Sequence, residues 1–235
     1  MTRIGAGGRG SAILPATVLI VAKAPVAGFA KTRLTPPLSP VQAARLAAAA
    51  LLDTLAAVRD CPLAHRMVAL TGDLGAAEYG AEIAAALTAF EVRSQRGDGF
   101  GVRLANAHAD AARAGLPVLQ IGMDTPQVTS RMLADAAGAL VAAGDALLGP
   151  AADGGWWGLG LPDPQAARLL ADVPMSTPAT GEHTRRALRS CGYRVGPLPM
   201  LTDVDHYDDA LRVAGDCSGR FAAEMDALTA GQAAR

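Results

Sequence analysis

The chain has 235 residues, of which 51% are hydrophobic and 18% charged, with a formal net charge of −1. This length and composition suit one large α/β domain whose core needs no disulfide or structural metal, and the near-zero charge argues against a basic surface for nucleic acid. The three cysteines and four histidines show neither CxxC nor zinc-ligand spacing, so we expect reduced thiols and a cytoplasmic protein.

Short apolar runs alternate with helical patterns along the chain. Strands are predicted at 17–22, 66–72, 90–94, 117–122, 145–151, 156–161 and 193–199. Helices are predicted at 40–58, 76–88, 101–115, 129–144 and 181–191, with two more after the last strand. Thr129 is the expected cap of the fourth helix. This alternation predicts an α/β fold, a three-layer α/β/α sandwich with a mostly parallel central sheet.

The first 14 residues differ from the rest in lacking a continuous apolar stretch. We expect 1–14 to be a flexible tail rather than a signal peptide, and 15–235 to form a single domain. The alanine-rich segment 43–58 is interrupted by Arg45 and Asp53, so we expect it to be too short and too polar to span a membrane. Neither a membrane nor a nucleic-acid partner is therefore expected.

Ligands of such sheets bind in loops beyond the carboxyl ends of the strands. The first of these loops, 21–34, reads VAKAPVAGFAKTRL and contains Lys23, Lys31 and Arg33 but no acid. Positive charge on an irregular loop suits a polyphosphate ligand, although a solvated surface loop would have the same composition. The absence of GxxxxGK[ST] argues against a P-loop NTPase.

A second loop, 95–104, reads QRGDGFGVRL and only superficially matches a dinucleotide fingerprint. Its third glycine comes one residue too early, and the loop follows the third predicted strand rather than the first. We interpret it as a tight turn in which Asp98 caps the next helix. Arg103 stands one turn into that helix and is placed to face the same pocket as the first loop.

Acidic residues follow two further strands. Asp124, in IGMDTP, suits Mg²⁺ or Mn²⁺ bridging a diphosphate, or else an ordinary turn. Asp203 and Asp205, in LTDVDHYDD, would point to the same side of an extended segment, where a shared cation relieves their repulsion. Alternatively they belong to a solvated cluster at a helix start, which Asp208 also serves. Together with Asp124 they predict a three-carboxylate site for Mg²⁺ or Mn²⁺, because these ions prefer oxygen ligands.

Glycines and tryptophans follow the fifth predicted strand. The segment GPAADGGWWGLGL combines Asp153 with Gly154 and Gly155, which permit a close approach of the backbone to a ligand. Trp156 or Trp157 is placed to stack on a base or a sugar, and at least one of the two is expected in the core. The Asp-Gly pair between apolar runs is also typical of a hairpin turn, and both interpretations are compatible.

Taken together, these motifs resemble those of a known family. In chain order they are AKAPxxGxAKTRL, GxDxP, GPAxDGGWxxxGL, the pair Ser176-Thr177 and DVDxxDD, and they extend over residues 17–211. The set resembles that of bacterial CofC-like transferases of unknown function with the glycosyltransferase-A (GT-A) fold. That family is often described as radical-SAM/selenodomain-associated or arsenosugar-type glycosyltransferases. More distantly, the set is similar to 2-phospho-lactate guanylyltransferases and molybdenum-cofactor nucleotidyltransferases.

The resemblance implies a nucleotide-diphospho-sugar transferase (GT-A) fold, dependence on Mg²⁺ or Mn²⁺, and a nucleotide or nucleotide-sugar substrate with a small acceptor. With the residue-based reasoning, the candidates for nucleotide and phosphate binding are Lys23, Gly28, Lys31, Thr32, Arg33 and Arg103. The candidate metal ligands are Asp124, Asp203 and Asp205. The candidate acceptor-side residues are Asp153, Gly154, Gly155 and Trp156. The candidate catalytic residues are Lys31, Arg33 and Asp153.

The chain also departs from its distant relatives. The nucleotidyltransferase signature LxGGxSxRMGxxK is absent, so base-reading contacts cannot be transferred, and Trp156 and Trp157 replace the threonine-rich segment expected of a guanylyltransferase. We therefore expect a metal-dependent transferase that uses a nucleotide sugar, with Asp153 as a base for the acceptor hydroxyl. The alternatives are a nucleotidyltransferase that releases pyrophosphate from a nucleoside triphosphate, and a catalytically silent nucleotide-binding protein.

Overall fold

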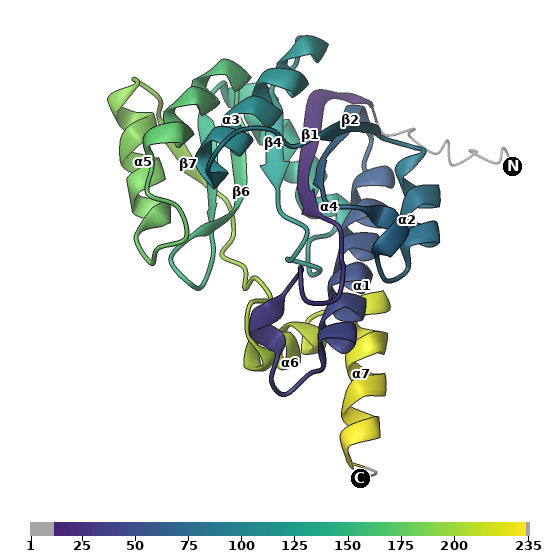
Figure 1. Ribbon diagram of the computed structural model, residues 1–235. Coiled ribbons are helices and arrows are strands. Elements are labelled where there is room, and N and C mark those ends of the chain that lie inside the picture. The colour runs from purple at the N-terminus through teal and green to yellow at the C-terminus, as the bar shows by residue number, and fades with distance from the viewer. Residues whose placement is uncertain (1–11, 234–235) are drawn as a thin grey trace, which may run out of the picture.

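The computed structural model describes residues 12–233, which are built around a seven-stranded sheet (Figure 1). The strands are β1 (Leu14–Lys23), β2 (Leu63–Thr71), β3 (Glu91–Ser94), β4 (Val118–Ile121), β5 (Ala146–Pro150), β6 (Trp156–Leu161) and β7 (Val195–Pro197). They lie in the order β3-β2-β1-β4-β6-β5-β7. Of the expected tail, 1–11 lie outside the described residues, and Leu14 already begins β1.

The sheet is mostly parallel, as predicted. Its only antiparallel strand among the described residues is β6, which runs against both β4 and β5. β5 and β6 are joined by a short turn at 151–155, and two strands joined so closely must be antiparallel. The hairpin interpretation of the Asp-Gly pair is therefore confirmed.

The helices begin and end close to their predicted positions. They are α1 (Pro40–Arg59), α2 (Gly80–Leu87), α3 (Phe100–Ala111), α4 (Ser130–Ala143), α5 (Thr180–Ser190), α6 (Tyr207–Gly215) and α7 (Arg220–Ala233). Four short 3₁₀ segments were not predicted, namely η1 (Thr32–Leu34), η2 (Leu74–Ala76), η3 (Ala112–Ala114) and η4 (Pro164–Asp172).

Side chains cap several of these helices. Thr129 caps α4 as predicted, because its side chain accepts the backbone N–H of Met132. Asp208 lies in the first turn of α6 as expected, although the carboxylate that accepts the His206 N–H belongs to Asp209. The prediction that Asp98 caps α3 is wrong. The residue before α3 is Gly99, with a φ of 83° and no side-chain cap.

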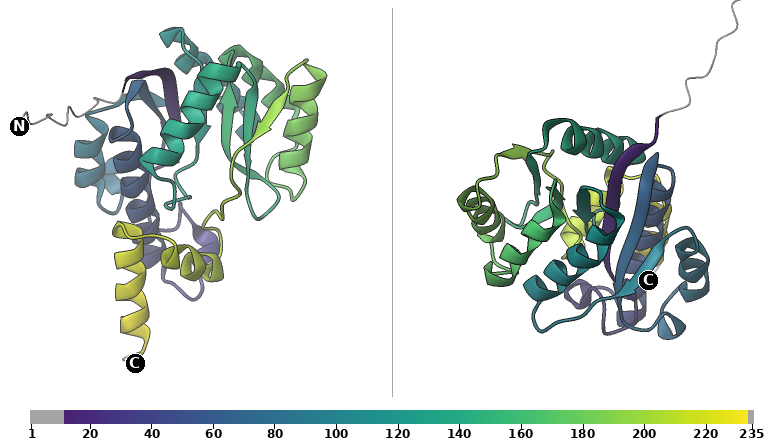
Figure 2. Two further views of the ribbon diagram at one scale, coloured as in Figure 1. Left: turned by 180° about the vertical axis from the view of Figure 1, so that it is seen from behind. Right: turned by 90° about the horizontal axis from the view of Figure 1, so that it is seen from above.

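Helices cover both faces of the sheet and give three layers (Figures 1 and 2). One apolar cluster joins the sheet to α1, α2 and α4, and a second joins its other face to α3, η4 and α5. β1 contributes to both, since Ile20 packs into the first cluster and its neighbour Leu19 into the second, as the alternation of a strand requires. The α/β/α sandwich is therefore confirmed.

A third apolar cluster lies beyond the end of the sheet where β1 ends (Figure 1). There η1, α1, α6 and α7 gather around the fully buried Phe221. Asp53 of α1 accepts the backbone N–H groups of Arg220 and Phe221 at 2.9 and 2.8 Å, and so stabilises the start of α7. These helices form a support beneath the loops that carry the candidate site residues.

α1 is a core helix of this fold. It has 20 residues and a mean hydropathy of 1.4 in its most apolar window, so by length and composition alone it is able to cross a membrane. The expectation that this segment is too short and too polar is therefore wrong. In the fold, however, 67% of that window is buried against the sheet and α7, which accounts for its apolar character.

Candidate nucleotide and metal site

From β1 the sheet extends to one side through β2 and β3, and to the other side through β4. β1 is therefore the point at which the strand order switches. Crevices outside the carboxyl ends of strands at such a switch point are where α/β sheets bind ligands. The loop after β1 carries Lys31 and Arg33, and the loop after β4 carries Asp124. The fold therefore brings the basic loop and an acidic loop to the same edge of the sheet.

Lys31 is held between two carboxylates. Its Nζ donates to Asp124 Oδ2 at 2.7 Å and to Asp205 Oδ1 at 2.9 Å, and its side chain is only 15% exposed. The Lys31 backbone is left-handed, with a φ of 50°, a conformation that costs about 1 to 3 kcal/mol outside glycine. Burial by itself would lower the pKa of Lys31, but the two carboxylates outweigh burial and raise that pKa above its usual value. Lys31 is therefore charged and is held by two ion pairs.

Arg33 contacts one of these two acids, Asp205, from the solvent side. Its Nη1 donates to Asp205 Oδ2 at 3.0 Å, while most of its side chain remains exposed. Asp205 thus accepts from Lys31 and Arg33 through different oxygens. Burial opposes ionisation of Asp205, yet the two cations prevail and hold its pKa below the usual value. Asp205 is therefore ionised at neutral pH.

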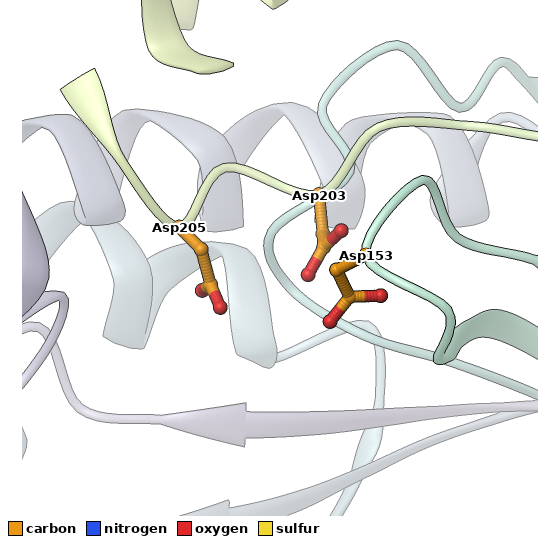
Figure 3. A group of neighbouring side chains, drawn as sticks. All are labelled: Asp153, Asp203 and Asp205. Carbon is orange, nitrogen blue, oxygen red and sulfur yellow. The ribbon is translucent and has the colours of Figure 1, made fainter. Parts of the chain in front are cut away.

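Three carboxylates from two loops meet beside these cations (Figure 3). Asp153, Asp203 and Asp205, here called the acid group, each offer an oxygen within 4.8 Å of the others. Val204 is buried, and its backbone N–H donates to the backbone oxygen of Asp124 at 2.9 Å. Because neighbouring residues of an extended segment point to opposite sides, Asp203 and Asp205 both point into the site.

Asp203 is a partly buried carboxyl that lies among other carboxylates. Burial, and then the charges of Asp124, Asp153 and Asp205, raise the pKa of its carboxyl to about 6. Within residues 12–233 no cation pairs with it. A concentration of negative charge of this kind is what a bound cation relieves.

The structure places all the predicted metal ligands at this edge but groups them differently. Asp203 and Asp205 lie together, and the third member of the acid group is Asp153, while Asp124 contacts Lys31. From the sequence, Asp153 is predicted as an acceptor-side and catalytic residue and not as a metal ligand. The signal for its position was that it follows β5, which runs in the same direction as β1.

The turn that carries Asp153 is fixed by its glycines. The N–H of Gly155 donates to Asp153 Oδ1 at 2.7 Å. Gly154 has a φ of 87°, and a Cβ there would collide with the backbone oxygen of Pro178. The N–H of Gly181, at the start of α5, donates to Gly154 O at 2.9 Å. Close packing against the segment before α5 thus requires a glycine at position 154.

The two tryptophans after this turn both have their indole N–H groups bonded. Trp157 is buried in the core and donates to Pro199 O at 2.8 Å. Trp156 is half-buried and donates to Thr184 Oγ1 of α5 at 3.1 Å. The expectation of a core tryptophan is confirmed for Trp157, and only Trp156 retains surface for a ligand.

Lys23 and Arg103 form a separate basic pair at the same edge. Neither makes an ion pair with any residue that the structure describes, and the Nζ of Lys23 lies 3.8 Å from the ring centroid of Phe29. Burial and the charge of Arg103 lower the pKa of Lys23. Gly28 adopts a φ of 75° in the same loop, and Thr32 is exposed at the start of η1.

The chain matches one known protein family. Residues 54–177, more than half of the sequence, match the family described as "Uncharacterized protein conserved in bacteria (DUF2064)". The chain belongs to this family. The DUF2064 description names no activity, and no curated protein matches the chain. The family therefore agrees with the resemblance inferred from the motifs but leaves the reaction open.

Several solved structures share the fold. A protein from Desulfovibrio desulfuricans G20, described as a candidate nucleotide-diphospho-sugar transferase, has a TM-score of 0.80 at 23% identity, over 92% of this chain and 96% of its own. Rv0371c from Mycobacterium tuberculosis H37Rv has a TM-score of 0.55 at 18% identity, over 86% and 98% of the two chains. The CMP:2-keto-3-deoxy-manno-octonic acid synthetase complexed with CTP has a TM-score of 0.50 at 12% identity, over 84% and 96%. These likenesses confirm the expected nucleotide-diphospho-sugar transferase fold.

Proposed function

We propose that the protein is a divalent-metal-dependent transferase that takes a sugar from a nucleotide sugar and passes it to a small acceptor. The observation that carries this proposal is the contact, at one edge of the sheet, between the cations Lys31 and Arg33 and the acid group. A ligand that suits both sets must bring negative charge and a metal ion together, as a metal-bound diphosphate does. The Desulfovibrio protein, described as a candidate for the same class of transferase, supports this choice.

The chemistry of the acid group fits Mg²⁺ or Mn²⁺. Its members offer only carboxylate oxygens, which these ions prefer. Oxygens that share one Mg²⁺ lie about 3 to 4 Å apart, so separations of up to 4.8 Å require only small side-chain movements. When bound, the ion would neutralise the diphosphate of the substrate. Asp124 is a further candidate ligand, because it becomes available once Lys31 turns toward the phosphates of the substrate.

The residue types of the cations in the first loop suit a phosphate ligand. Lys23 and Lys31 are the chain's only lysines, although lysine and arginine together number 21. All the remaining residues in this count are arginines, so these two lysines differ from the general surface charge. A lysine ammonium is a compact point charge that suits phosphate oxygens. We assign Lys31 and Arg33 to the leaving phosphate, and Lys23 and Arg103 to the rest of the phosphate chain.

Asp153 is a candidate for two roles, as a ligand of the metal ion and as the base at the acceptor side. Its Oδ1 accepts the N–H of Gly155, which fixes the carboxylate at the tip of the β5–β6 turn. The residue is exposed, so an acceptor hydroxyl reaches it directly from solvent. This favours Asp153 as the base that accepts the hydroxyl proton, with Asp124 completing the metal ligands.

Product analysis tests the proposed function. The full-length protein is incubated with Mn²⁺ and a panel of nucleotide sugars in the presence of small hydroxyl acceptors. Release of a nucleoside diphosphate is the expected result. Tight nucleotide binding without turnover on any member of the panel would contradict an enzymatic role and indicate a nucleotide-binding protein instead.

A nucleotidyltransferase is the second candidate, favoured by the fold shared with a synthetase that binds CTP. The same cations and acids would serve this reaction, because a nucleoside triphosphate with Mg²⁺ presents the same groups to the protein. Release of pyrophosphate from a nucleoside triphosphate, with no release of diphosphate from nucleotide sugars, would favour this candidate over the first.

Replacing Lys31 by methionine is expected to weaken the binding of a nucleoside diphosphate with Mg²⁺ by roughly tenfold or more, because an ammonium contact to phosphate is lost. Binding of the nucleoside alone should not change. Without nucleotide, the variant should bind Mn²⁺ more tightly than the parent, because the ammonium no longer competes for Asp124 and Asp205. Calorimetric titration measures all three affinities.

The matched control for this variant is Arg45→Met, which removes a cation that pairs with Glu78 at 3.1 Å outside the site. An equal loss of affinity for the nucleoside and the diphosphate in Lys31→Met would argue against a phosphate-binding role for Lys31.

A further inference from the structure

Two exposed phenylalanines flank the unpaired cations Lys23 and Arg103. Phe29, in the first loop, and Phe100, at the start of α3, are each 43% exposed. The Lys23 Nζ lies 3.8 Å from the ring centroid of Phe29, and the Arg103 Cζ lies 5.7 Å from that of Phe100. Single apolar residues at a surface need no explanation, but two aromatic rings beside two unpartnered cations form a surface with both apolar and charged character.

These four side chains lie in the same region of the molecule. Burial and the charge of Arg103 lower the pKa of Lys23, so the two cations lie within electrostatic reach of each other. The Arg103 Nε is buried and has no hydrogen-bond partner among the described residues. The loop that leads into α3 is tied to β1 and β2 near the ends of these strands, because the Gln95 Nε2 donates to Ala22 O and Ala69 O at 2.8 and 2.9 Å.

The Phe29 ring is held in position and is not a loose surface side chain. Gly72, which follows β2, has a φ of 93°, and a Cβ at this position would stand 3.0 Å from Cε1 of the ring and 2.9 Å from the Cβ of Ala24. A residue without a side chain is therefore needed where the ring packs. The ammonium of Lys23 covers part of the ring, and the exposed remainder is available to a ligand.

We propose that Phe29 and Phe100 bind the nucleoside of the substrate, with the base stacked on a phenyl ring, and that Lys23 and Arg103 bind the phosphate next to the ribose. This inference rests on the proposed function and deepens it, because it orients the nucleotide. The nucleoside lies beside the ends of β1 and β2 and the start of α3, and the outer phosphate lies at Lys31. The acceptor then enters from the β5–β6 turn.

Charge and shape complementarity support this arrangement. The base is the one flat, uncharged part of a nucleotide, and aromatic rings are the side chains that bind such a surface without reading its hydrogen bonds. The cations beside the rings have no acid to neutralise them among the described residues, which leaves them free for the inner phosphate. Lys31 and Arg33, in contrast, already contact the acids that lie toward β5.

Calorimetric titration of the full-length protein tests this orientation. The ligands are ADP, GDP, CDP and UDP, each with Mg²⁺, and pyrophosphate with Mg²⁺. In Phe100→Ala and in Phe29→Ala, the affinity for the best-bound nucleoside diphosphate should fall roughly tenfold or more, because the stacking contact between the ring and the base is lost. The affinity for pyrophosphate should stay at the parent value.

Two further variants sharpen the result. Phe100→Tyr keeps the ring and should keep the parent's affinity for the nucleoside diphosphate. Val141→Ala truncates a residue of α4 that is 38% exposed, and it controls for the loss of an exposed apolar side chain.

Three outcomes would overturn the inference. Parent-like nucleotide affinity in both alanine variants would reject the rings as the nucleoside site and leave the proposed function standing. An equal loss of pyrophosphate affinity would also reject it, because the rings would then support the phosphate site or the fold. If the parent binds neither nucleotides nor pyrophosphate, the proposed function fails, and the inference fails with it.

Discussion

Replacing Asp205 by asparagine is expected to weaken Mn²⁺ binding by roughly 100-fold or more, since even a residue that only supports a metal ligand is worth about 10- to 100-fold. Asp205 belongs to the acid group and also accepts from Lys31 and Arg33. Asparagine keeps the shape of the side chain but removes its charge, so the variant loses attraction for the ion. Titration of the full-length, metal-free protein with Mn²⁺ measures the affinity.

Asp145→Asn is the matched control for this experiment. Asp145 accepts from Arg194 at 3.0 Å and is 26% exposed, against 28% for Asp205. It precedes β5 and therefore lies at the opposite edge of the sheet. If Asp205→Asn binds Mn²⁺ as tightly as this control, the acid group is not a metal site.

The same titration identifies the third ligand. Asp124→Asn should weaken Mn²⁺ binding if the ligands are those expected from the sequence, with Asp203 and Asp205. Asp153→Asn should weaken it if the ligands are the members of the acid group. A loss in Asp124→Asn alone would support the assignment of Asp153 as the base for the acceptor.

Much of the fold could be predicted because its elements are marked locally. The longer strands coincide with apolar runs, although β3 is mostly polar and exposed. The glycines at 115 and 144 adopt positive φ where η3, which continues α3, and α4 end. The antiparallel direction of β6 is harder to predict from its own residues, because a strand buried on both faces has the same apolar pattern whichever way it runs. The three-residue 3₁₀ segments η1, η2 and η3 escaped prediction, since so few residues show no helical period.

The position of the site could be predicted, but the partners of its residues could not. A place just after a strand is visible in the sequence, so Lys31, Asp124 and Asp205 were expected at one edge. Lys31 and Asp124 are 93 residues apart and meet because β1 neighbours β4, and Asp205 is 174 residues from Lys31. The exposure of Phe29 and Phe100 could not be predicted either, because phenylalanine is usually buried.

A second large effect is expected at His108 of α3, outside the candidate site. His108 is fully buried, and its Nε2 donates to Gln120 Oε1 of β4 at 2.9 Å, since an amide oxygen can only accept. Its Nδ1 is buried and has no partner within the described residues. Burial lowers the pKa of His108 to about 4, and the bond to Gln120 offsets only part of that decrease. The folded protein therefore keeps this ring neutral.

Acidification should destabilise the protein through this histidine. In the unfolded chain the group binds a proton below about pH 6.5, but in the folded protein only below about pH 4. Between these values the unfolded state binds more protons, so the stability that depends on the neutral ring is complete above pH 6.5 and falls with decreasing pH. At about pH 5 the free energy of unfolding should have fallen by about 2 kcal/mol on this account.

His108→Gln should remove this part of the pH dependence, because glutamine does not titrate and its amide can still donate to Gln120. Urea unfolding of the parent and the variant at about pH 7.5 and about pH 5 measures the effect, and the parent should lose about 2 kcal/mol more than the variant. The groups common to both proteins cancel in that difference, and His183→Gln on α5 controls for removal of a histidine. If parent and His108→Gln lose the same free energy, the ring must accept a proton inside the fold at ordinary pH. The region around Nδ1 would then have to open to water or supply an acceptor, which its packing between α3 and β4 does not provide.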